Sequence, residues 1–180
     1  LKGHTERALS SFEAALQLNS QNVEALAGRA RAWRVKELNE RARDDLDEVL
    51  RRQSAFPLYL YNRAQACYAL GQYDNALLDL TAALRQNKKF YPAYGLVGAV
   101  LAQKGDFKRA AKAYNKALSV NREYAYAHLG LAALELAQGR QEEGFHEFEI
   151  AVRLNSDDYA PYFNRAEAYW REGKREEALT

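Results

Sequence analysis

The residues of this chain that are best suited to chemistry are three histidines and one cysteine: His4, His128, His146 and Cys67. Imidazole and thiolate groups bind metals or transfer protons when several of them recur at short, regular spacings. These four residues lie far apart in the sequence and show no metal-ligand spacing. We therefore expect no metal site and no catalytic centre, with His128 a packed structural histidine and Cys67 a small core residue.

Other signatures of catalysis are also missing from the sequence. It contains no glycine-rich phosphate loop, no nucleophile elbow and no zinc-protease motif. The paired carboxylates of Glu142 and Glu143 fall at a predicted helix start, where negative charge interacts favourably with the helix dipole. The sequence thus predicts a protein that is not an enzyme and that binds no cofactor.

The charge balance limits the classes of partner. The chain has 26 Lys and Arg against 24 Asp and Glu, a net charge of +2. Nucleic-acid binding requires a basic face, and in the densest basic stretch, residues 29–52, acidic residues alternate with the basic ones. We expect no nucleic-acid partner and, without an apolar run of spanning length, no membrane insertion. A single cysteine fits a cytoplasmic or a periplasmic setting, the cytoplasm being slightly favoured.

A glycine recurs with a fixed period of 34 residues. Its members are Gly3, Gly71, Gly105, Gly139 and Gly173, the first two being separated by two periods. Glu37 stands at the one point of the series that lacks glycine. A period of this size indicates a stacked array of small units rather than one globular core. We expect the turn at Glu37 to be longer than the others or differently shaped.

Small and bulky apolar residues keep the same period. Five residues after each glycine point comes a small residue, and four residues later a bulky one: Ala8, Ala42, Ala76, Ala110 and Gly144, then Phe12, Leu46, Leu80, Tyr114 and Phe148. Seven residues before each glycine point lies a second small residue: Ala30, Ala64, Gly98, Ala132 and Ala166. These spacings place apolar residues on one helical stripe, so each period holds two helices joined by a short turn. An isolated pair leaves an apolar face bare, and the pairs must therefore stack.

Residues 61–76, YNRAQACYALGQYDNA, closely resemble the first half of the tetratricopeptide repeat (TPR) motif, and residues 106–111 resemble its turn. The resemblance extends over the whole chain and implies an all-α TPR solenoid of antiparallel helix pairs in a right-handed superhelix. It divides the single array, 1–180, into a half repeat 1–22, full repeats 23–56, 57–90, 91–124 and 125–158, and a partial repeat 159–180. Neither end has the polar face of a capping repeat, so we expect a stretch of a longer array.

The resemblance also implies where a partner binds. In TPR proteins the first helix of each pair lines a concave groove, and the corresponding residues here are largely apolar and aromatic. The predicted groove residues are Arg31, Arg34, Tyr61, Asn62, Gln65, Tyr68, Ala99, Gln103, Tyr126, Leu129, Ala133, Phe163, Asn164, Glu167, Trp170 and Arg171. Tyr and Trp offer large contact areas with one polar group each. We expect small residues such as Gly28, Gly95 and Gly130 to leave room in the floor of this groove for an inserted chain or helix.

Two known TPR binding modes do not match these residues. The carboxylate clamp of co-chaperone TPR domains needs Lys, Asn and Arg at fixed positions of three repeats, and only Asn62 matches. The asparagine ladder of the O-GlcNAc-transferase type is reduced to Asn62 and Asn164. The leading hypothesis is therefore a scaffold that binds a largely apolar protein or peptide segment, with acidic ends facing Arg31, Arg34 and Arg171. The alternatives are the substrate-recruiting arm of a larger enzyme or secretion machine, and self-association through the terminal half repeats.

Overall fold

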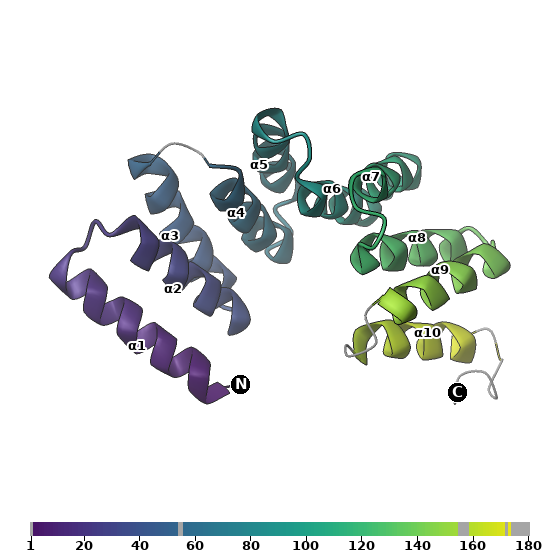
Figure 1. The fold of residues 1–180 in the computed structure, drawn as a ribbon, viewed down its shortest axis with the longest axis horizontal. Coiled ribbons are helices and arrows are strands. Elements are labelled where there is room, and N and C mark those ends of the chain that lie inside the picture. The colour runs from purple at the N-terminus through teal and green to yellow at the C-terminus, as the bar shows by residue number, and fades with distance from the viewer. Residues whose placement is uncertain (1, 54–55, 155–158, 172, 174–180) are drawn as a thin grey trace. The chain divides into compact units, whose positions relative to one another are not determined.

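The computed structural model describes residues 2–53, 56–154, 159–171 and 173, and its regular secondary structure within these ranges is entirely α-helical (Figure 1). The helices are α1 (Lys2–Leu18), α2 (Val23–Val35), α3 (Asn39–Arg52), α4 (Pro57–Ala69), α5 (Tyr73–Gln86), α6 (Tyr91–Gln103), α7 (Phe107–Val120), α8 (Ala125–Ala137), α9 (Gln141–Leu154) and α10 (Tyr159–Arg171). Among the described residues, none of these helices combines the length and hydropathy needed to cross a lipid bilayer.

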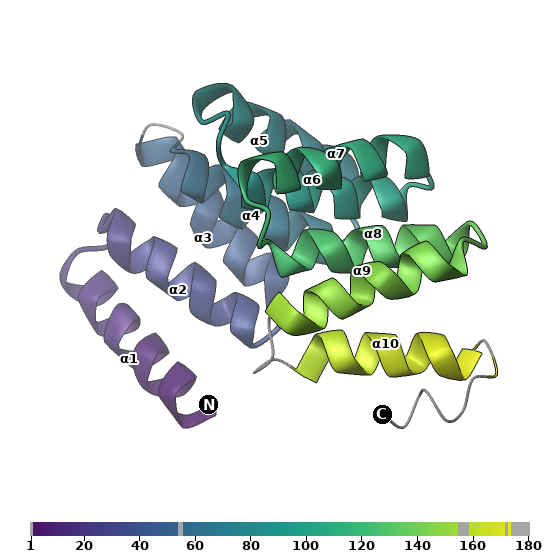
Figure 2. The ribbon, with the colours of Figure 1, turned by 45° about the vertical axis from the view of Figure 1, so that its right-hand side comes forward.

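The chain forms two compact units, Leu1–Lys89 with α1 to α5 and Phe90–Thr180 with α6 to α10. Each unit is a stack of helices in which sequence neighbours pack against each other. The first helices of successive pairs begin 34 residues apart: Val23, Pro57, Tyr91, Ala125 and Tyr159. Figure 2 shows this stacking in the second unit, where α8, α9 and α10 lie side by side. The all-α fold of stacked helix pairs is thus confirmed within each unit.

Local sequence explains where the helices begin. The side chain of Asn22 accepts a hydrogen bond from the Ala25 amide at 2.9 Å, which caps α2, and Asp106 caps α7 in the same way through Arg109. Pro57 opens α4 in the first turn, where the missing N–H has no helical partner to lose. These local signals favour the starts of α2, α4 and α7 before any tertiary contact forms.

The turn at Glu37 has the same shape as the glycine turns. Glu37 adopts φ 60°, close to the 71° of Gly71. The amide of Leu38 donates to the Trp33 carbonyl at 2.9 Å, as the amide of Gln72 donates to the Cys67 carbonyl at 2.8 Å. The expectation of a longer or different turn was therefore wrong. The helix ends impose the left-handed conformation even on a residue with a Cβ atom.

A Glu37→Gly substitution is expected to raise the free energy of unfolding by about 1 kcal/mol, because an L-residue pays roughly that amount in the left-handed region. The matched variant Gly71→Ala should lower stability by a similar amount, since a Cβ at Gly71 would meet no atom within 4 Å and only backbone strain would act. Urea unfolding curves of both variants measure the effect. A Glu37→Gly variant that is less stable than the chain would contradict this prediction.

The periodic small residues lie at the closest approach of paired helices. Ala30 of α2 and Ala42 of α3 are fully buried, together with Leu46, in one core cluster. Ala64 and Ala76 are likewise fully buried in α4 and α5. Short side chains let the helix axes approach, and the bulky residues of one helix then fill the grooves of the other.

Candidate partner-binding faces

In the first unit, three predicted groove residues meet between α2 and α4. The hydroxyl of Tyr61 acts electrostatically on the guanidinium of Arg34, and the Gln65 side-chain amide donates to that hydroxyl at 3.1 Å. Arg31 lies one turn before Arg34 and is exposed. Tyr68 is half-buried, and its ring packs against Tyr73 with centroids 5.9 Å apart.

A hollow of about 650 Å³ lies between α1 and α2 of this unit. It is lined by His4, Thr5, Ala8, Phe12, Gly28, Arg31, Ala32, Arg34 and Val35. Burial lowers the pKa of the Arg34 guanidinium, and the positive charge of Arg31 lowers it further, against the opposing effect of Tyr61. The hollow therefore combines apolar walls with two neighbouring cations.

In the second unit, a hollow of about 400 Å³ lies between α8 and α10. It is lined by Leu129, Ala133, Leu136, Ala137, Phe148, Glu167, Ala168 and Arg171. Four of the predicted groove residues thus line one hollow, two from each of these helices. Phe148 reaches it from α9 and belongs to the core cluster that holds α10 through Ala168.

Large aromatic side chains are exposed on α8 and α10, the two helices between which this second hollow lies. Phe163 and Trp170 of α10 are 62% and 60% exposed, and Tyr126 of α8 is 41% exposed. Phe163 and Trp170 are seven residues apart and share one helix face, as Tyr126 and Ala133 do on α8. We call Tyr126, Leu129, Ala133, Phe163 and Trp170 the aromatic face. Within the described ranges, its three aromatic members are the predicted groove aromatics that are exposed, since Tyr61 and Tyr68 are half-buried.

The remaining predicted groove residues differ widely in exposure. Asn62 and Ala99 are 7% and 6% exposed, so each offers little area to a partner. Gln103 is exposed at the end of α6. Glu167 and Arg171 form an ion pair at 2.6 Å on the surface of α10. The side chain of Asn164 lies outside the described part of the structure.

The glycines of the predicted groove floor are covered by aromatic rings of the chain itself. A Cβ atom at Gly28 would collide with the ring of Phe12, and one at Gly130 with the ring of Tyr114. A Cβ at Gly95 would lie 2.7 Å from the Tyr124 ring. The expectation that these glycines leave room for an inserted chain was wrong, because a missing Cβ is used here to seat a neighbouring ring.

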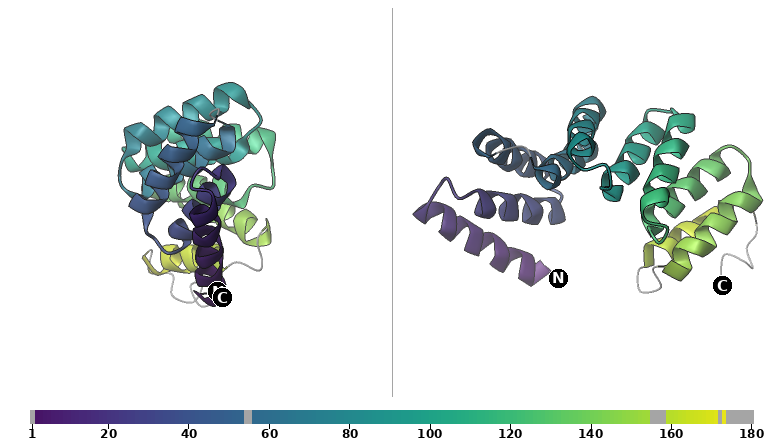
Figure 3. Two further views of the ribbon diagram at one scale, coloured as in Figure 1. Left: turned by 90° about the vertical axis from the view of Figure 1, so that its left-hand side faces the viewer. Right: turned by 45° about the horizontal axis from the view of Figure 1, so that its top comes forward.

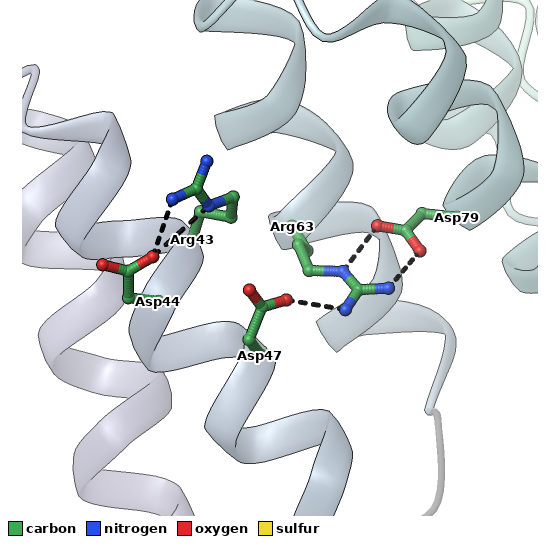
Figure 4. Close-up of polar contacts among 5 residues, drawn as sticks. All are labelled: Arg43, Asp44, Asp47, Arg63 and Asp79. Carbon is green, nitrogen blue, oxygen red and sulfur yellow. Dashed lines mark hydrogen bonds and ion pairs between the residues drawn. The ribbon is translucent and has the colours of Figure 1, made fainter.

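The charged residues of α3 to α5 form a network that sequence reasoning missed (Figure 4). Arg63 donates to both carboxylate oxygens of Asp79 at 2.6 and 2.8 Å and to Asp47 at 2.7 Å, which joins α4 to both α5 and α3. Asp79 is 5% exposed, and its hydrogen bonds raise the pKa of Arg63. Arg29 and Asp45 repeat the bidentate pair one period earlier. This recurrence of Arg and Asp 16 residues apart was the available signal.

His128 and Cys67, two of the residues whose side chains could do chemistry, are buried and pack as structural residues. His128 is buried, with Nδ1 2.6 Å from a carboxylate oxygen of Glu147 and Nε2 3.1 Å from the Arg122 carbonyl oxygen. Cys67 is 3% exposed, and burial raises the pKa of its thiol. Within the described ranges, no group of three or more His, Cys, Asp or Glu side chains is placed to hold a metal ion.

Comparison with protein families decides the identity of this fold. Profiles of the tetratricopeptide repeat family match residues 2–54, 57–90 and 98–147, which together make up most of the chain. The chain belongs to the tetratricopeptide repeat family. The resemblance found in the sequence is therefore confirmed, and the helix pairs are TPR hairpins.

Several TPR-containing proteins are similar to this chain. Superkiller complex protein 3 of Mus musculus is 26% identical over 161 residues, covering 88% of this chain and 10% of that protein. Hsp70-Hsp90 organizing protein 1 of Glycine max is 25% identical over 158 residues, covering 67% and 28%. The thermophilic TPR protein TTC0263 of Thermus thermophilus superposes with a TM-score of 0.82 at 26% identity, covering 93% of this chain and 92% of that one. The chain thus spans about a tenth of the length of its mouse relative.

Proposed function

We propose that this TPR chain is a non-enzymatic scaffold that binds a largely apolar peptide or helix of a partner protein on the aromatic face of its second unit. TPR proteins in general support protein–protein interaction, and they are generally non-catalytic. The name of the soybean relative refers to the organisation of two other proteins, Hsp70 and Hsp90. These relatives support a scaffold in general, and the particular face is chosen from the structure.

The observation that supports this face most directly is that α10, which lines the hollow through Glu167 and Arg171, also carries two exposed aromatic rings. Phe163 and Trp170 expose more than half of their surface to water, which is costly for large apolar groups unless a partner covers them. The hollow between α8 and α10 lies on the same side and has apolar walls from Leu129 and Leu136. Its volume of about 400 Å³ is sufficient for one or two bulky side chains.

A phage-displayed library of random 16-residue peptides, selected on the immobilised chain, tests this function. A synthetic copy of the most enriched peptide should bind the triple variant Tyr126→Ala/Phe163→Ala/Trp170→Ala about 100-fold more weakly, since aromatic anchors contribute more than about 1 kcal/mol each. Phe107→Ala is the matched control, because this residue is 40% exposed on α7 of the same unit. Circular dichroism checks that helicity is retained. Equal affinity for the chain and the triple variant would contradict the proposal.

The length of the relatives favours a second candidate function. The chain corresponds to about a tenth of Superkiller complex protein 3, a protein whose name places it in a complex. The scaffold would then be a recruiting arm of a larger assembly or enzyme, as one of the sequence-based alternatives proposes. A catalytic domain in a longer form of the protein, with activity that falls when the aromatic face is substituted, would support this candidate. Self-association remains a separate proposal, which light scattering over a range of concentrations tests.

A further inference from the structure

A hollow of about 410 Å³ lies in the first unit between α3, α4 and α5. Its walls include Arg43 of α3, Cys67 of α4, and Asn75 and Leu78 of α5, together with Gln72 from the turn between α4 and α5. All three helices are described over their whole length. The hollow therefore lies inside the stack, with a helix of the chain on each side of α4.

The corresponding space one period earlier is filled by a tryptophan. Trp33 of α2 is 9% exposed and belongs to the same core cluster as Leu9 of α1. The guanidinium of Arg41, from α3, lies over the ring of Trp33 at 5.0 Å from the centroid. Figure 3 (right) shows α1 alongside α2 in this part of the first unit. The indole ring is thus packed by residues of the preceding and the following helix.

Cys67 stands 34 residues after Trp33, and its small side chain leaves the corresponding space open. Arg43 and Asn75 stand at the positions of Leu9 and Arg41, and both line the hollow. The walls of the hollow therefore surround the place that the indole ring occupies one period earlier. Cys67 has the smallest side chain of the five residues at this position of the period, which are Trp33, Cys67, Leu101, Glu135 and Tyr169.

An aromatic ring also occupies this position in the second unit. The ring of Tyr169 stacks on Phe145, with centroids 3.9 Å apart and an interplanar angle of 7°. Phe145 stands three periods after Arg43, as Tyr169 stands three periods after Cys67. The repeat thus accommodates a flat ring at this position in both units, packed in each case against the helix that precedes it.

The charged side chains around the hollow are already paired with one another (Figure 4). Arg43 donates a hydrogen bond to Asp44 at 2.9 Å, and Arg63 donates to both Asp47 and Asp79. A further charge in the hollow would lose its hydration and compete with these pairs, whereas a neutral ring leaves them intact. The electrostatics of the hollow therefore favour a neutral occupant over an acidic or a basic one.

The wall residues suit an indole ring in particular. Guanidinium groups stack on aromatic faces, most strongly on that of tryptophan, and Arg43 brings such a group to the hollow. The side-chain amide oxygens of Gln72 and Asn75 are acceptors for the indole N–H. Leu78 is 69% exposed and adds apolar area for the residues next to the tryptophan.

We propose that the hollow between α3, α4 and α5 binds the side chain of a tryptophan from a partner protein. The bound ring takes the place that Trp33 fills one period earlier, between Arg43 and Asn75 and against Cys67. This site rests on the proposed scaffold function and extends it, because it adds a tryptophan-selective site on the first unit to the aromatic face of the second.

Titration of the ¹⁵N-labelled chain with N-acetyl-L-tryptophanamide, followed by ¹H–¹⁵N correlation spectra, tests this inference. The amide signals of residues 63–79 should shift and saturate at roughly millimolar concentrations, as expected for a ligand of this size. N-acetyl-L-leucinamide is the control ligand, and it should bind at least about tenfold more weakly because it cannot stack on a guanidinium.

A substitution that fills the hollow from within shows whether the binding is specific to it. Cys67→Trp copies Trp33 and should abolish the saturable shifts, whereas Cys67→Ala keeps the hollow open and should bind N-acetyl-L-tryptophanamide within about twofold of the chain. Thermal unfolding followed by circular dichroism checks that Cys67→Trp is folded, and its unfolding temperature should equal or exceed that of the chain.

A second variant removes the walls instead and decides the matter if Cys67→Trp does not fold. Arg43→Ala/Asn75→Ala should bind N-acetyl-L-tryptophanamide about fivefold more weakly, because it lacks both side chains that flank the ring. Arg85→Ala is the matched control, since Arg85 is an exposed arginine of α5 outside the walls named here. It should bind as the chain does.

Distinct results overturn this inference and the proposed function. Equal binding of the two amides, or equal binding of N-acetyl-L-tryptophanamide to the chain and the wall variant, would overturn the inference. If the peptides selected on the chain still lose affinity for the Tyr126/Phe163/Trp170 variant, the scaffold function of the second unit stands. If only those peptides fail to respond, the aromatic face is wrong and the tryptophan site remains.

Discussion

Gly130→Ala is expected to lower the free energy of unfolding by about 1–3 kcal/mol, the usual cost of overpacking a core. The added methyl group would collide with the ring of Tyr114, which is 4% exposed and has little freedom to move. Alanine favours a helix over glycine by roughly 0.5–1 kcal/mol, so at an open site the same change would be stabilising. Urea unfolding of the chain and the variant measures the difference.

The double variant Tyr114→Leu/Gly130→Ala should recover most of that loss. The ring of Tyr114 occupies the space that a Cβ would need at both Gly98 and Gly130. In the first unit the corresponding bulky residue is Leu46, and the residue 16 positions after it is Asn62 rather than glycine. Where the bulky residue is Leu46 rather than Tyr114, the facing residue is Asn62 rather than Gly130, so a smaller side chain at one position goes with a larger one at the other. Additive losses in the double-mutant cycle would show that Tyr114 and Gly130 are not coupled in this way.

Asp79→Ala is expected to cost about 3 kcal/mol, the lower end of the range for breaking a buried ion pair. Asp79 is the main cause of the raised pKa of Arg63. Arg63 would keep its charge even without Asp79, because an arginine guanidinium stays protonated throughout the neutral and moderately alkaline range. A group with a raised folded pKa stabilises below its unfolded value and loses that contribution only as the pH rises through the folded pKa. The loss in Asp79→Ala should therefore be the same at about pH 7 and about pH 10. Chemical denaturation at the two pH values measures it.

Two further variants show whether the loss of stability in Asp79→Ala comes from leaving Arg63 buried without its carboxylate partner. Asp47→Ala should cost less than about 1 kcal/mol, because the Asp47 side chain is 52% exposed and such pairs contribute little. The variant Arg63→Val/Asp79→Ala copies the residues of the next period, Val97 and Ala113, and should recover most of the stability lost in Asp79→Ala. A double variant less stable than Asp79→Ala would contradict this account of the network.

The 34-residue period alone was sufficient to predict the helix pairs. The turn glycines, the small residues such as Ala30 and Ala42, and the bulky Leu46 each recur at offsets that only paired helices satisfy. Helix propensity and turn geometry depend on a few neighbouring residues, so one occurrence of the pattern predicts little. The prediction becomes strong because the same pattern recurs in every period. For the same reason the turn at Glu37 follows its neighbours, since the helix ends on both sides define it.

The candidate sites were predicted less completely. The TPR resemblance predicted that Leu129, Phe163 and Trp170 lie on the groove side of their helices, and this assignment as partner-binding residues stays a prediction. The period could not show that Asn62 is buried or that Phe12 and Tyr114 cover the glycines of the expected groove floor. Those features depend on the relative size of side chains from different helices.

The sequence by itself determined the family, the helix pairs and the absence of known catalytic motifs, because these follow from local residue patterns repeated along the chain. Only the tertiary structure decided which groove residues are open and which arginines are paired. Arg63 and Arg34 are both arginines of first helices, yet one lies between two carboxylates and the other beside a second arginine. The difference arises from packing between helices, where burial and the nearest charges determine what each side chain can bind.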